Sequence, residues 1–329
     1  MHPMSTTSEL KDIARPIADD LVEFEKHFRD AVRSDAALLD KITHYIVRRK
    51  GKKVRPMLVF LSARLFGEVE KPVYVAASLV ELLHTATLVH DDVVDSSFYR
   101  RGFFSVNALW GNKGAVLVGD YLLSRGLLLA LDNEEYKLLQ ILSRAVRDMS
   151  EGELLQIKKA RKLDITEEVY FDIIRQKTAS LMAASCAAGA SAAKAVEPDV
   201  EKMRAFGENI GIAFQIKDDL LDFGQEETGK PKGIDIKEKK MTLPLIYTLT
   251  QVSPSEKKSM MKTIRKYNTD TRKVESLISK IFEMGGVDYA RRKMKEYQER
   301  AISILHEMPE NEARRSLERL VSFVVTRSK

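Results

Sequence analysis

The chain has 329 residues, of which 54 are Lys or Arg and 48 are Asp or Glu, giving a net charge of +6. A hydrophobic fraction of 44% suits a globular protein with a large core. The basic residues show neither zinc-finger spacing nor interleaved aromatics, which disfavours nucleic acid as a partner.

Cys186 is the single cysteine, which excludes an intramolecular disulfide and favours a reducing compartment. The N-terminus lacks the charged start and apolar core of a signal peptide. The longest uncharged stretch, 178–193, is shorter than the roughly 20 residues that a membrane-spanning helix needs. We therefore expect a cytoplasmic protein with no membrane anchor.

Helical periodicity dominates the chain. Apolar residues recur at spacings of three and four over 13–33, 73–95, 115–131, 135–160, 167–193 and 200–222. No stretch alternates apolar and polar residues over the length of a strand, and breaks such as 101–114 are marked by Gly. We predict an all-α fold, one large domain of mostly antiparallel helices spanning 1–329. Residues 250–329 are more charged and carry no motif, so we expect peripheral helices there.

Two aspartate clusters of the same design end the helical runs 73–95 and 200–222. Carboxylates are costly within apolar helices unless their charge is compensated. Residues four apart share a helical face, so each cluster presents hard oxygen ligands of the kind that Mg²⁺ binds together with substrate phosphates. A solvated acidic helix end would explain one cluster, but two copies favour a shared magnesium–diphosphate site. The clusters are Asp91, Asp92 and Asp95, and Asp218, Asp219 and Asp222.

Basic residues flank both clusters along the sequence. Arginine binds phosphate in a bidentate manner and lysine supplies a point charge. Each basic residue alone is more often a solvated surface group, but their placement around both clusters indicates a diphosphate site. They are Lys52, Arg55, Arg100, Arg101, Lys230 and Lys240.

The order of these motifs resembles the trans-isoprenyl diphosphate synthase (polyprenyl synthetase) family, and most of all its long-chain all-trans members. The resemblance implies the isoprenoid synthase type I fold, in which helices surround a central cavity, and a homodimer. The matching segments within residues 50–245 are 51–56 (GKKVRP), 81–102, 119–123 (GDYLL), 176–179 (QKTA), 214–219 (FQIKDD) and 229–230 (GK).

The resemblance implies a prenyltransferase that adds isopentenyl diphosphate head to tail (1′-4) to an allylic diphosphate in successive condensations. The allylic diphosphate is held with Mg²⁺, usually three ions in this family, between the clusters. Its C–O bond ionises to a carbocation and diphosphate, and the double bond of isopentenyl diphosphate attacks the cation. A proton is then lost to the released diphosphate. This chemistry requires a stabilised leaving group and two oriented substrates.

By position, the resemblance assigns roles to individual residues. The six aspartates act on magnesium directly or through water, and Lys177, Thr178 and Gln215 are also catalytic, the last two near the reacting carbons. The allylic diphosphate is bound by Arg100, Lys177, Lys230 and Lys240. Isopentenyl diphosphate is bound by Lys52, Arg55, His84 and Arg101. The alternative for His84, which its apolar surroundings suggest, is that of a core histidine. Asp235 is expected beside the second cluster.

Three residues before the first cluster bear on how long the product can grow. Positions four, five and eight before Asp91 are Thr87, Ala86 and Leu83, which lie on the helical face that a growing tail would follow. Short-chain members of the family often place an aromatic residue there. We therefore expect a long, water-insoluble product and transient membrane contact for its release. The alternative for Ala86 is close helix packing only.

We considered several alternative functions for this sequence. A short-chain (geranyl, farnesyl or geranylgeranyl) diphosphate synthase shares all of these motifs. A class I terpene cyclase usually has a different second metal motif. A di-iron bundle would use Glu81 and His84, but the sequence has no second Glu-x-x-His element. A non-catalytic bundle protein would have degraded aspartate motifs. The sequence leaves open whether the chain is a homodimer or the catalytic half of a heteromer.

Overall fold

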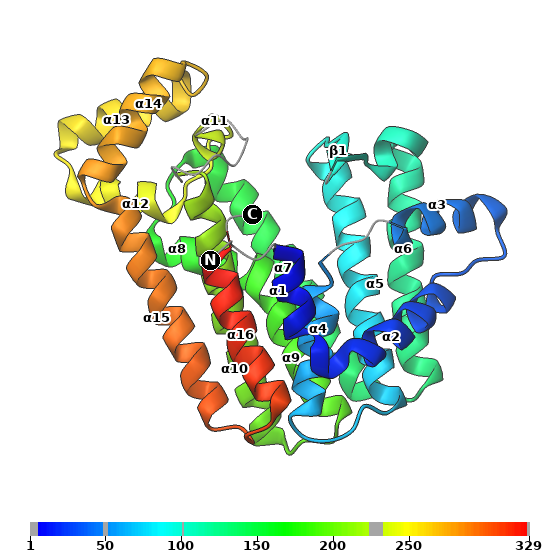
Figure 1. Ribbon diagram of the computed structural model, residues 1–329. Coiled ribbons are helices and arrows are strands. Elements are labelled where there is room, and N and C mark those ends of the chain that lie inside the picture. Colours follow the sequence, from blue (N-terminus) through cyan, green and yellow to red (C-terminus); the bar gives the residue numbers. More distant parts are fainter. Residues whose placement is uncertain (1–5, 49–51, 101, 224–232, 328–329) are drawn as a thin grey trace.

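The computed structural model describes residues 6–48, 52–100, 102–223 and 233–327, and over these ranges the protein is a bundle of helices (Figure 1). The predicted all-α fold is confirmed. The exception within the described ranges is one short antiparallel hairpin, in which Tyr99 pairs with Phe104 and Arg100 with Phe103. In chain order the elements are α1 (Thr6–Ile13), the 3₁₀ turn η1 (Arg15–Ile17), α2 (Ala18–Ala31), α3 (Ala37–Val47), α4 (Val54–Arg64), α5 (Lys71–Val94), β1 (Tyr99–Arg100), β2 (Phe103–Phe104), α6 (Val106–Asp132), α7 (Tyr136–Lys162), α8 (Glu167–Ile174), the π-helical turn η2 (Arg175–Ala179), α9 (Ser180–Ala192), α10 (Glu197–Leu221), α11 (Ile234–Lys237), α12 (Leu243–Gln251), α13 (Pro254–Lys266), α14 (Thr271–Glu283), α15 (Gly286–His306) and α16 (Glu312–Thr326).

The core forms where α4, α5 and α10 pack around the alanine-rich helix α9. Small residues let the backbones approach closely. A Cβ added at Gly189 of α9 would lie 2.2 Å from the carbonyl oxygen of Val59 on α4. A Cβ added at Gly207 of α10 would lie 2.5 Å from the carbonyl oxygen of Met182 on α9. The positions of α4 and α10 are therefore fixed by close backbone contact as well as by apolar burial.

Two helices, α5 and α6, are long and apolar enough to cross a membrane by length and composition alone. The most apolar window of α5 is 67% buried inside the protein, so α5 is a core helix. The corresponding window of α6 is only 33% buried. One side of α6 packs along α5, and its other side leaves apolar side chains exposed.

The segment 101–114, predicted as a break, contains β2 and the first turns of α6 where it is described. Within these turns Gly111 leaves the helical conformation, with φ 73° and ψ 165°. Asn107 is buried, and its Nδ2 donates to the carbonyl oxygen of Asp92 at 3.1 Å. Ser105 Oγ likewise donates to the carbonyl oxygen of Ser97 at 2.7 Å. These contacts fold the segment back onto the end of α5, which its local composition did not reveal.

The expectation that residues 250–329 are peripheral is wrong for α15 and α16. α15 lies along α10, and α16 contacts both α10 and α4 (Figure 1). Leu305, Leu317 and Leu320 are fully buried in the same core as α5 and α9. The apolar residues of α16 recur at helical spacing and form one buried face, which the charged residues between them obscured. α13 and α14 do lie at the outer edge (Figure 1). That the chain forms one domain stays a prediction.

The C-terminal ends of α5 and α10 lie at the same end of the bundle, at the top of Figure 1. The hairpin of β1 and β2 follows α5 at this end, and α11 follows α10. The fold thus collects the last turns of two long helices, together with the segments that follow them.

Candidate active site

Both aspartate clusters occupy the C-terminal ends of long helices. Asp91 and Asp92 lie in the last turn of α5, and Asp218 and Asp219 lie in the last turn of α10. The third aspartate of each cluster is the residue that caps the helix. A helix C-terminus carries partial negative charge, so carboxylates there are unfavourable. Neither helix has a basic residue in its last turn, so compensating cations must come from other elements.

In the first cluster the buried carboxylate is bound within the protein. Asp92 is 3% exposed, and Arg100 on β1 donates from Nε to Asp92 Oδ1 at 2.7 Å. Asp91 is half-buried, and Asp95 is exposed. Burial raises the pKa of Asp91, and the Lys177 ammonium opposes this rise. Asp91 and Asp95 therefore remain the carboxylates of this cluster that can serve a ligand.

In the second cluster the buried carboxylate accepts three hydrogen bonds. Asp219 is fully buried. Its Oδ2 accepts from the Tyr170 hydroxyl at 2.7 Å, and its Oδ1 accepts from Gln215 Nε2 at 3.1 Å and from Lys240 Nζ at 2.9 Å. The three donors come from α8, α10 and the segment before α12. Asp219 therefore joins three parts of the chain around one carboxylate.

The other two aspartates of the second cluster have separate partners. Arg327, just past α16, forms an ion pair with Asp218 and lies 4.0 Å above the ring of Phe214. Burial raises the pKa of Asp218, and Arg327 opposes this rise. Asp222 accepts from the backbone N–H groups of Ile234 at 2.9 Å and Asp235 at 3.1 Å, and so holds the start of α11.

Asp235 lies close to the second cluster, as the sequence led us to expect. Its carboxylate is 3.5 Å from Lys240 Nζ, the ammonium that also contacts Asp219. Burial raises the pKa of Asp235 to about 7, against the opposing effect of Lys240. The Asp235 carboxylate thus lies among other carboxylates, and the ammonium of Lys240 contacts both Asp235 and Asp219.

The π-helical turn η2 connects the two clusters. Its Lys177 pairs with Glu153 of α7 and acts electrostatically on Asp91. The next residue, Thr178, donates from Oγ1 to Gln215 Oε1 at 2.9 Å. A Cβ added at Gly152 of α7 would lie 2.7 Å from Gln176 Cβ, so η2 is packed tightly against α7. Such π-helical turns recur at functional sites, and this one directs consecutive side chains to different clusters.

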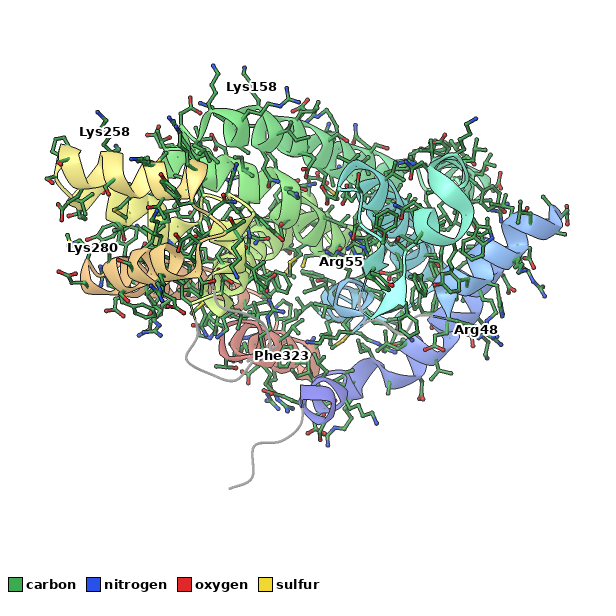
Figure 2. All side chains as sticks on the ribbon, turned by 90° about the horizontal axis from the view of Figure 1, so that it is seen from above. Arg48, Arg55, Lys158, Lys258, Lys280 and Phe323 are labelled. Atoms are coloured by element: carbon green, nitrogen blue, oxygen red, sulfur yellow. The ribbon has the colours of Figure 1, made fainter. Side chains whose placement is uncertain are left out.

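The remaining predicted residues lie on α4 and α5 or outside the described ranges. Lys52 precedes α4 and is exposed, and Arg55 in its first turn is half-buried. Viewed onto the end of the bundle, Arg55 lies near the middle of the molecule (Figure 2). His84 on α5 is 8% exposed. Arg101 and Lys230 lie outside the described residues.

The donor atoms suit a hard divalent cation. Across the described residues, no three His, Cys, Asp or Glu side chains lie close enough together to hold a metal by themselves. Mg²⁺ fits such a site because it keeps several waters and binds one or two carboxylates plus substrate phosphates. Asp91, Asp95, Asp218 and Asp222 are the cluster aspartates that keep exposed surface. Cations that can bind phosphate lie beside the two clusters.

A profile of the polyprenyl synthetase family matches residues 36–281 of the chain. The chain is a polyprenyl synthetase. The resemblance seen in the motifs is thereby confirmed, and so is the class of activity, because members of this family are prenyltransferases. The alternative functions of a class I terpene cyclase and a di-iron bundle are rejected because the family match is to polyprenyl synthetases.

Relatives of this polyprenyl synthetase span its whole length. The all-trans-nonaprenyl-diphosphate synthase (geranyl-diphosphate specific) of Rhodobacter capsulatus is 35% identical, over 96% of this chain and 98% of that protein. The geranylgeranyl diphosphate synthase of Saccharolobus solfataricus is also 35% identical, over 92% of this chain and 94% of that protein. Sequence identity therefore does not separate long-chain from short-chain relatives.

Crystal structures of two relatives share the fold. A decaprenyl diphosphate synthase from Rhodobacter capsulatus superposes with a TM-score of 0.91 at 34% identity, covering 97% of this chain and 99% of that one. A polyprenyl synthase from Caulobacter crescentus CB15, complexed with calcium and isoprenyl diphosphate, has a TM-score of 0.87 at 34% identity, covering 97% and 98%.

Four residues at this site of the polyprenyl synthetase escaped the sequence analysis. Glu153 and Gln156 on α7 surround Lys177, whose Nζ is 3.5 Å from Gln156 Oε1. The spacing of Glu153 and Gln156, three apart on one helix, is only a weak sequence signal for a functional site. Tyr170 and Arg327 left no signal, since Tyr170 lies 49 positions and Arg327 109 positions from its aspartate partner.

Replacing Tyr170 with Phe removes only the hydroxyl that holds Asp219. We expect the carboxylate to shift and to release Lys240 and Gln215 from their positions. Because a hydrogen bond to a charged group contributes roughly 1.5–3 kcal/mol, kcat/KM for the allylic substrate should fall about 10- to 100-fold. Steady-state kinetics at saturating Mg²⁺ measure this loss.

Tyr289→Phe is the matched control for Tyr170→Phe. Tyr289 donates to Glu167 Oε1 at 2.6 Å, a tyrosine–carboxylate bond that ties α15 to the start of the same helix, α8. We expect kinetics close to those of the parent enzyme. Equal losses of kcat/KM in the two variants would mean that Tyr170 acts only through the packing of α8. An unchanged kcat/KM in Tyr170→Phe would refute any role of its hydroxyl in catalysis.

Proposed function

We propose that this polyprenyl synthetase makes a long all-trans polyprenyl diphosphate by successive head-to-tail (1′-4) additions of isopentenyl diphosphate to an allylic diphosphate. The observation that carries the proposal is the pairing of two acidic helix ends with cations drawn from separate elements. A site of this kind suits a multiply charged leaving group held by metal ions and basic side chains. A short-chain product remains the alternative, which the relative in Saccharolobus solfataricus favours.

The aspartates would divide into ligands and positioning residues. Asp91, Asp95, Asp218 and Asp222 have exposed surface and would bind Mg²⁺, with three ions in each site. Asp92 and Asp219 are buried and accept hydrogen bonds within the protein, and they would act on the metals through water or by holding their neighbours. When bound, Mg²⁺ would neutralise charge on the departing diphosphate. The relative from Caulobacter crescentus holds calcium, another hard cation.

The basic residues would orient the two substrates. Arg100, Lys177 and Lys240 each pair with an acidic side chain, so their charges are already positioned before a diphosphate arrives. Together with Lys230 they would bind the allylic diphosphate. Isopentenyl diphosphate would lie at the α4 end of the site. The residues proposed to bind it are Lys52, Arg55, His84 and Arg101.

Thr178 and Gln215 would lie beside the reacting carbons. Thr178 donates to Gln215, and Gln215 donates in turn to Asp219. This chain fixes both side chains relative to the second cluster. Ordering groups in this way before reaction lowers the entropic cost of bringing the reactants together.

Replacing Asp91 or Asp218 with Ala removes a proposed metal ligand. We expect kcat to fall at least about 100-fold, because stabilisation of the departing diphosphate is lost. The matched control is Asp132→Ala, since Asp132 also ends a long helix, α6, but outside this site. Product formation with Mg²⁺, isopentenyl diphosphate and farnesyl diphosphate measures the loss. Nearly unimpaired turnover in Asp91→Ala or Asp218→Ala would refute the assignment of that residue as a metal ligand.

The face of α5 behind the first cluster would receive the growing tail. Leu83 and Ala86 are buried, and Thr87 is half-buried with its hydroxyl donating to the carbonyl oxygen of His84 at 2.9 Å. Ala86 places no bulky side chain at this level of α5, and the polar atom of Thr87 is satisfied within the helix. A long product follows from these two features, and its release would involve transient membrane contact by a cytoplasmic enzyme.

Replacing Ala86 with Tyr should shorten the product without abolishing turnover, because the ring would fill the path of the tail. Overpacking costs about 1–3 kcal/mol, so thermal unfolding must confirm that the variant remains folded. Chromatographic sizing of the products measures the effect, and Ala86→Ser should retain the parent length. A product distribution that Ala86→Tyr leaves unchanged would contradict the path.

We also propose a homodimer that pairs the exposed face of α6. Leu117 is 67% exposed and Leu128 is 47% exposed, and four further apolar residues of α6 exceed 40% exposure. Apolar faces of this extent mark interaction sites, and a homodimer covers the same face on both subunits. The four further residues are Leu109, Val116, Leu127 and Leu131.

Charged substitutions on this face should separate the subunits. We expect Leu117→Asp combined with Leu128→Asp to give a monomer, because two carboxylates would be desolvated in each half of the interface. Light scattering after size exclusion measures the mass. Val196→Asp, at a residue 63% exposed before α10, should leave the dimer intact. A double variant that stays dimeric would place the interface elsewhere.

A further inference from the structure

A cavity of about 540 Å³ lies at the C-terminal end of α7 and shares no residue with the aspartate site. This volume is within the range of small-molecule sites. Four of its lining residues are cations, and none of them is acidic. The lining residues are Ala160, Arg161, Lys162, Leu163, Lys239 and Arg265.

The cations reach the cavity from three separate elements. Arg161 and Lys162 end α7, Lys239 follows α11, and Arg265 lies near the end of α13. Arg265 Nη2 donates to the carbonyl oxygen of Lys162 at 3.3 Å, which joins two of these elements directly. The tertiary structure therefore gathers like charges that lie far apart in the sequence.

Two turns at this cavity hold unusual backbone conformations. Leu163 has φ 54° and Lys239 has φ 59°, both in the left-handed region that side chains other than glycine disfavour. Leu163 N–H donates to the carbonyl oxygen of Lys159 at 2.9 Å, and Lys239 N–H donates to that of Ile236 at 3.0 Å. Such conformations persist only where the surroundings impose them, and they cluster at ligand sites.

A simpler explanation covers only part of this arrangement. Basic residues at a helix C-terminus stabilise the helix dipole, which explains Arg161 and Lys162. It does not explain Lys239 and Arg265, which come from other elements. The nearest acidic residue in sequence, Asp164, lies 3.8 Å from Lys159 and is not part of the lining.

We propose that this cavity binds a multiply charged phosphate anion. Arginine side chains grip phosphate oxygens in a bidentate manner, and lysines add charge. The cavity is lined by one arginine from α7, Arg161, and one from α13, Arg265. Inorganic diphosphate, which the reaction releases, and the head group of a prenyl diphosphate are the two sources of such an anion.

An anion in this cavity would act on the aspartate site through neighbouring residues. Lys239 directly precedes Lys240, whose ammonium donates to Asp219 at 2.9 Å. Drawing Lys239 toward an anion would shift the turn that positions Lys240. This coupling rests on the role proposed for Lys240, and it predicts that diphosphate inhibits the enzyme from outside the substrate sites.

Calorimetric titration of the full chain with inorganic diphosphate, in EDTA, tests the binding. The variant Lys162→Gln with Arg265→Gln removes two lining cations. The control is Lys158→Gln with Lys258→Gln, which removes equal charge from the same helices, α7 and α13. Lys158 and Lys258 project outward at the rim of the molecule (Figure 2). Farnesyl diphosphate in place of diphosphate shows which source the cavity accepts.

We expect the parent and the control to bind one more equivalent of diphosphate than Lys162→Gln with Arg265→Gln. Equal binding by that variant and the parent would overturn the proposal. Equal loss in the control would overturn it too, because the effect would then be diffuse surface charge. Binding is measured without turnover, so the outcome is independent of which product the enzyme makes.

A kinetic measurement tests the coupling separately. With both substrates saturating, added diphosphate should still inhibit the parent and the control, but not Lys162→Gln with Arg265→Gln. Inhibition that persists unchanged in this variant would show that the cavity does not communicate with Lys240.

Discussion

Carboxylates at the negative ends of two long helices are the constraint on which the rest of the structure depends. The last turns of α5 and α10 carry aspartates where helix dipoles already concentrate negative charge. Such an arrangement is stable only if cations are brought to it. The hairpin supplies Arg100, η2 supplies Lys177, the segment before α12 supplies Lys240, and the C-terminal residues supply Arg327. Four parts of the chain thus converge because of one electrostatic requirement.

The same requirement separates the aspartates by environment. The fully buried Asp219 has three donors within the protein, and Asp92 has Arg100. Asp91 and Asp218 are partly exposed, and burial raises the pKa of each. A carboxylate that is costly to ionise alone gains most from a bound cation. These partly exposed carboxylates would therefore be suited to a metal ion, and the internal ion pairs would keep them in place.

In the function proposed above, the helices that carry the charges would also confine the apolar part of the reaction. α5 has aspartates at its end and buried small and apolar residues one and two turns earlier, including Ala86. Close backbone packing at Gly189 and Gly207 fixes α4 and α10 against α9. The proposed reaction needs a polar end for diphosphates and an apolar interior for the tail, and α5 would supply both.

The sequence by itself determined the helical class, the two aspartate clusters and the short-range features that accompany them. Periodicity and spacing are local, so Asp91 and Asp95 could be recognised without a fold, whereas Lys177 and Thr178 were recognised through the resemblance of their motif to the family. The tertiary structure alone decided which carboxylates are buried and which cations meet them. Tyr170 reaches Asp219, and Arg327 reaches Asp218, across separations that no periodic pattern records. It also placed α16 in the core and gathered four cations at the end of α7, because burial and charge balance depend on which segments pack together.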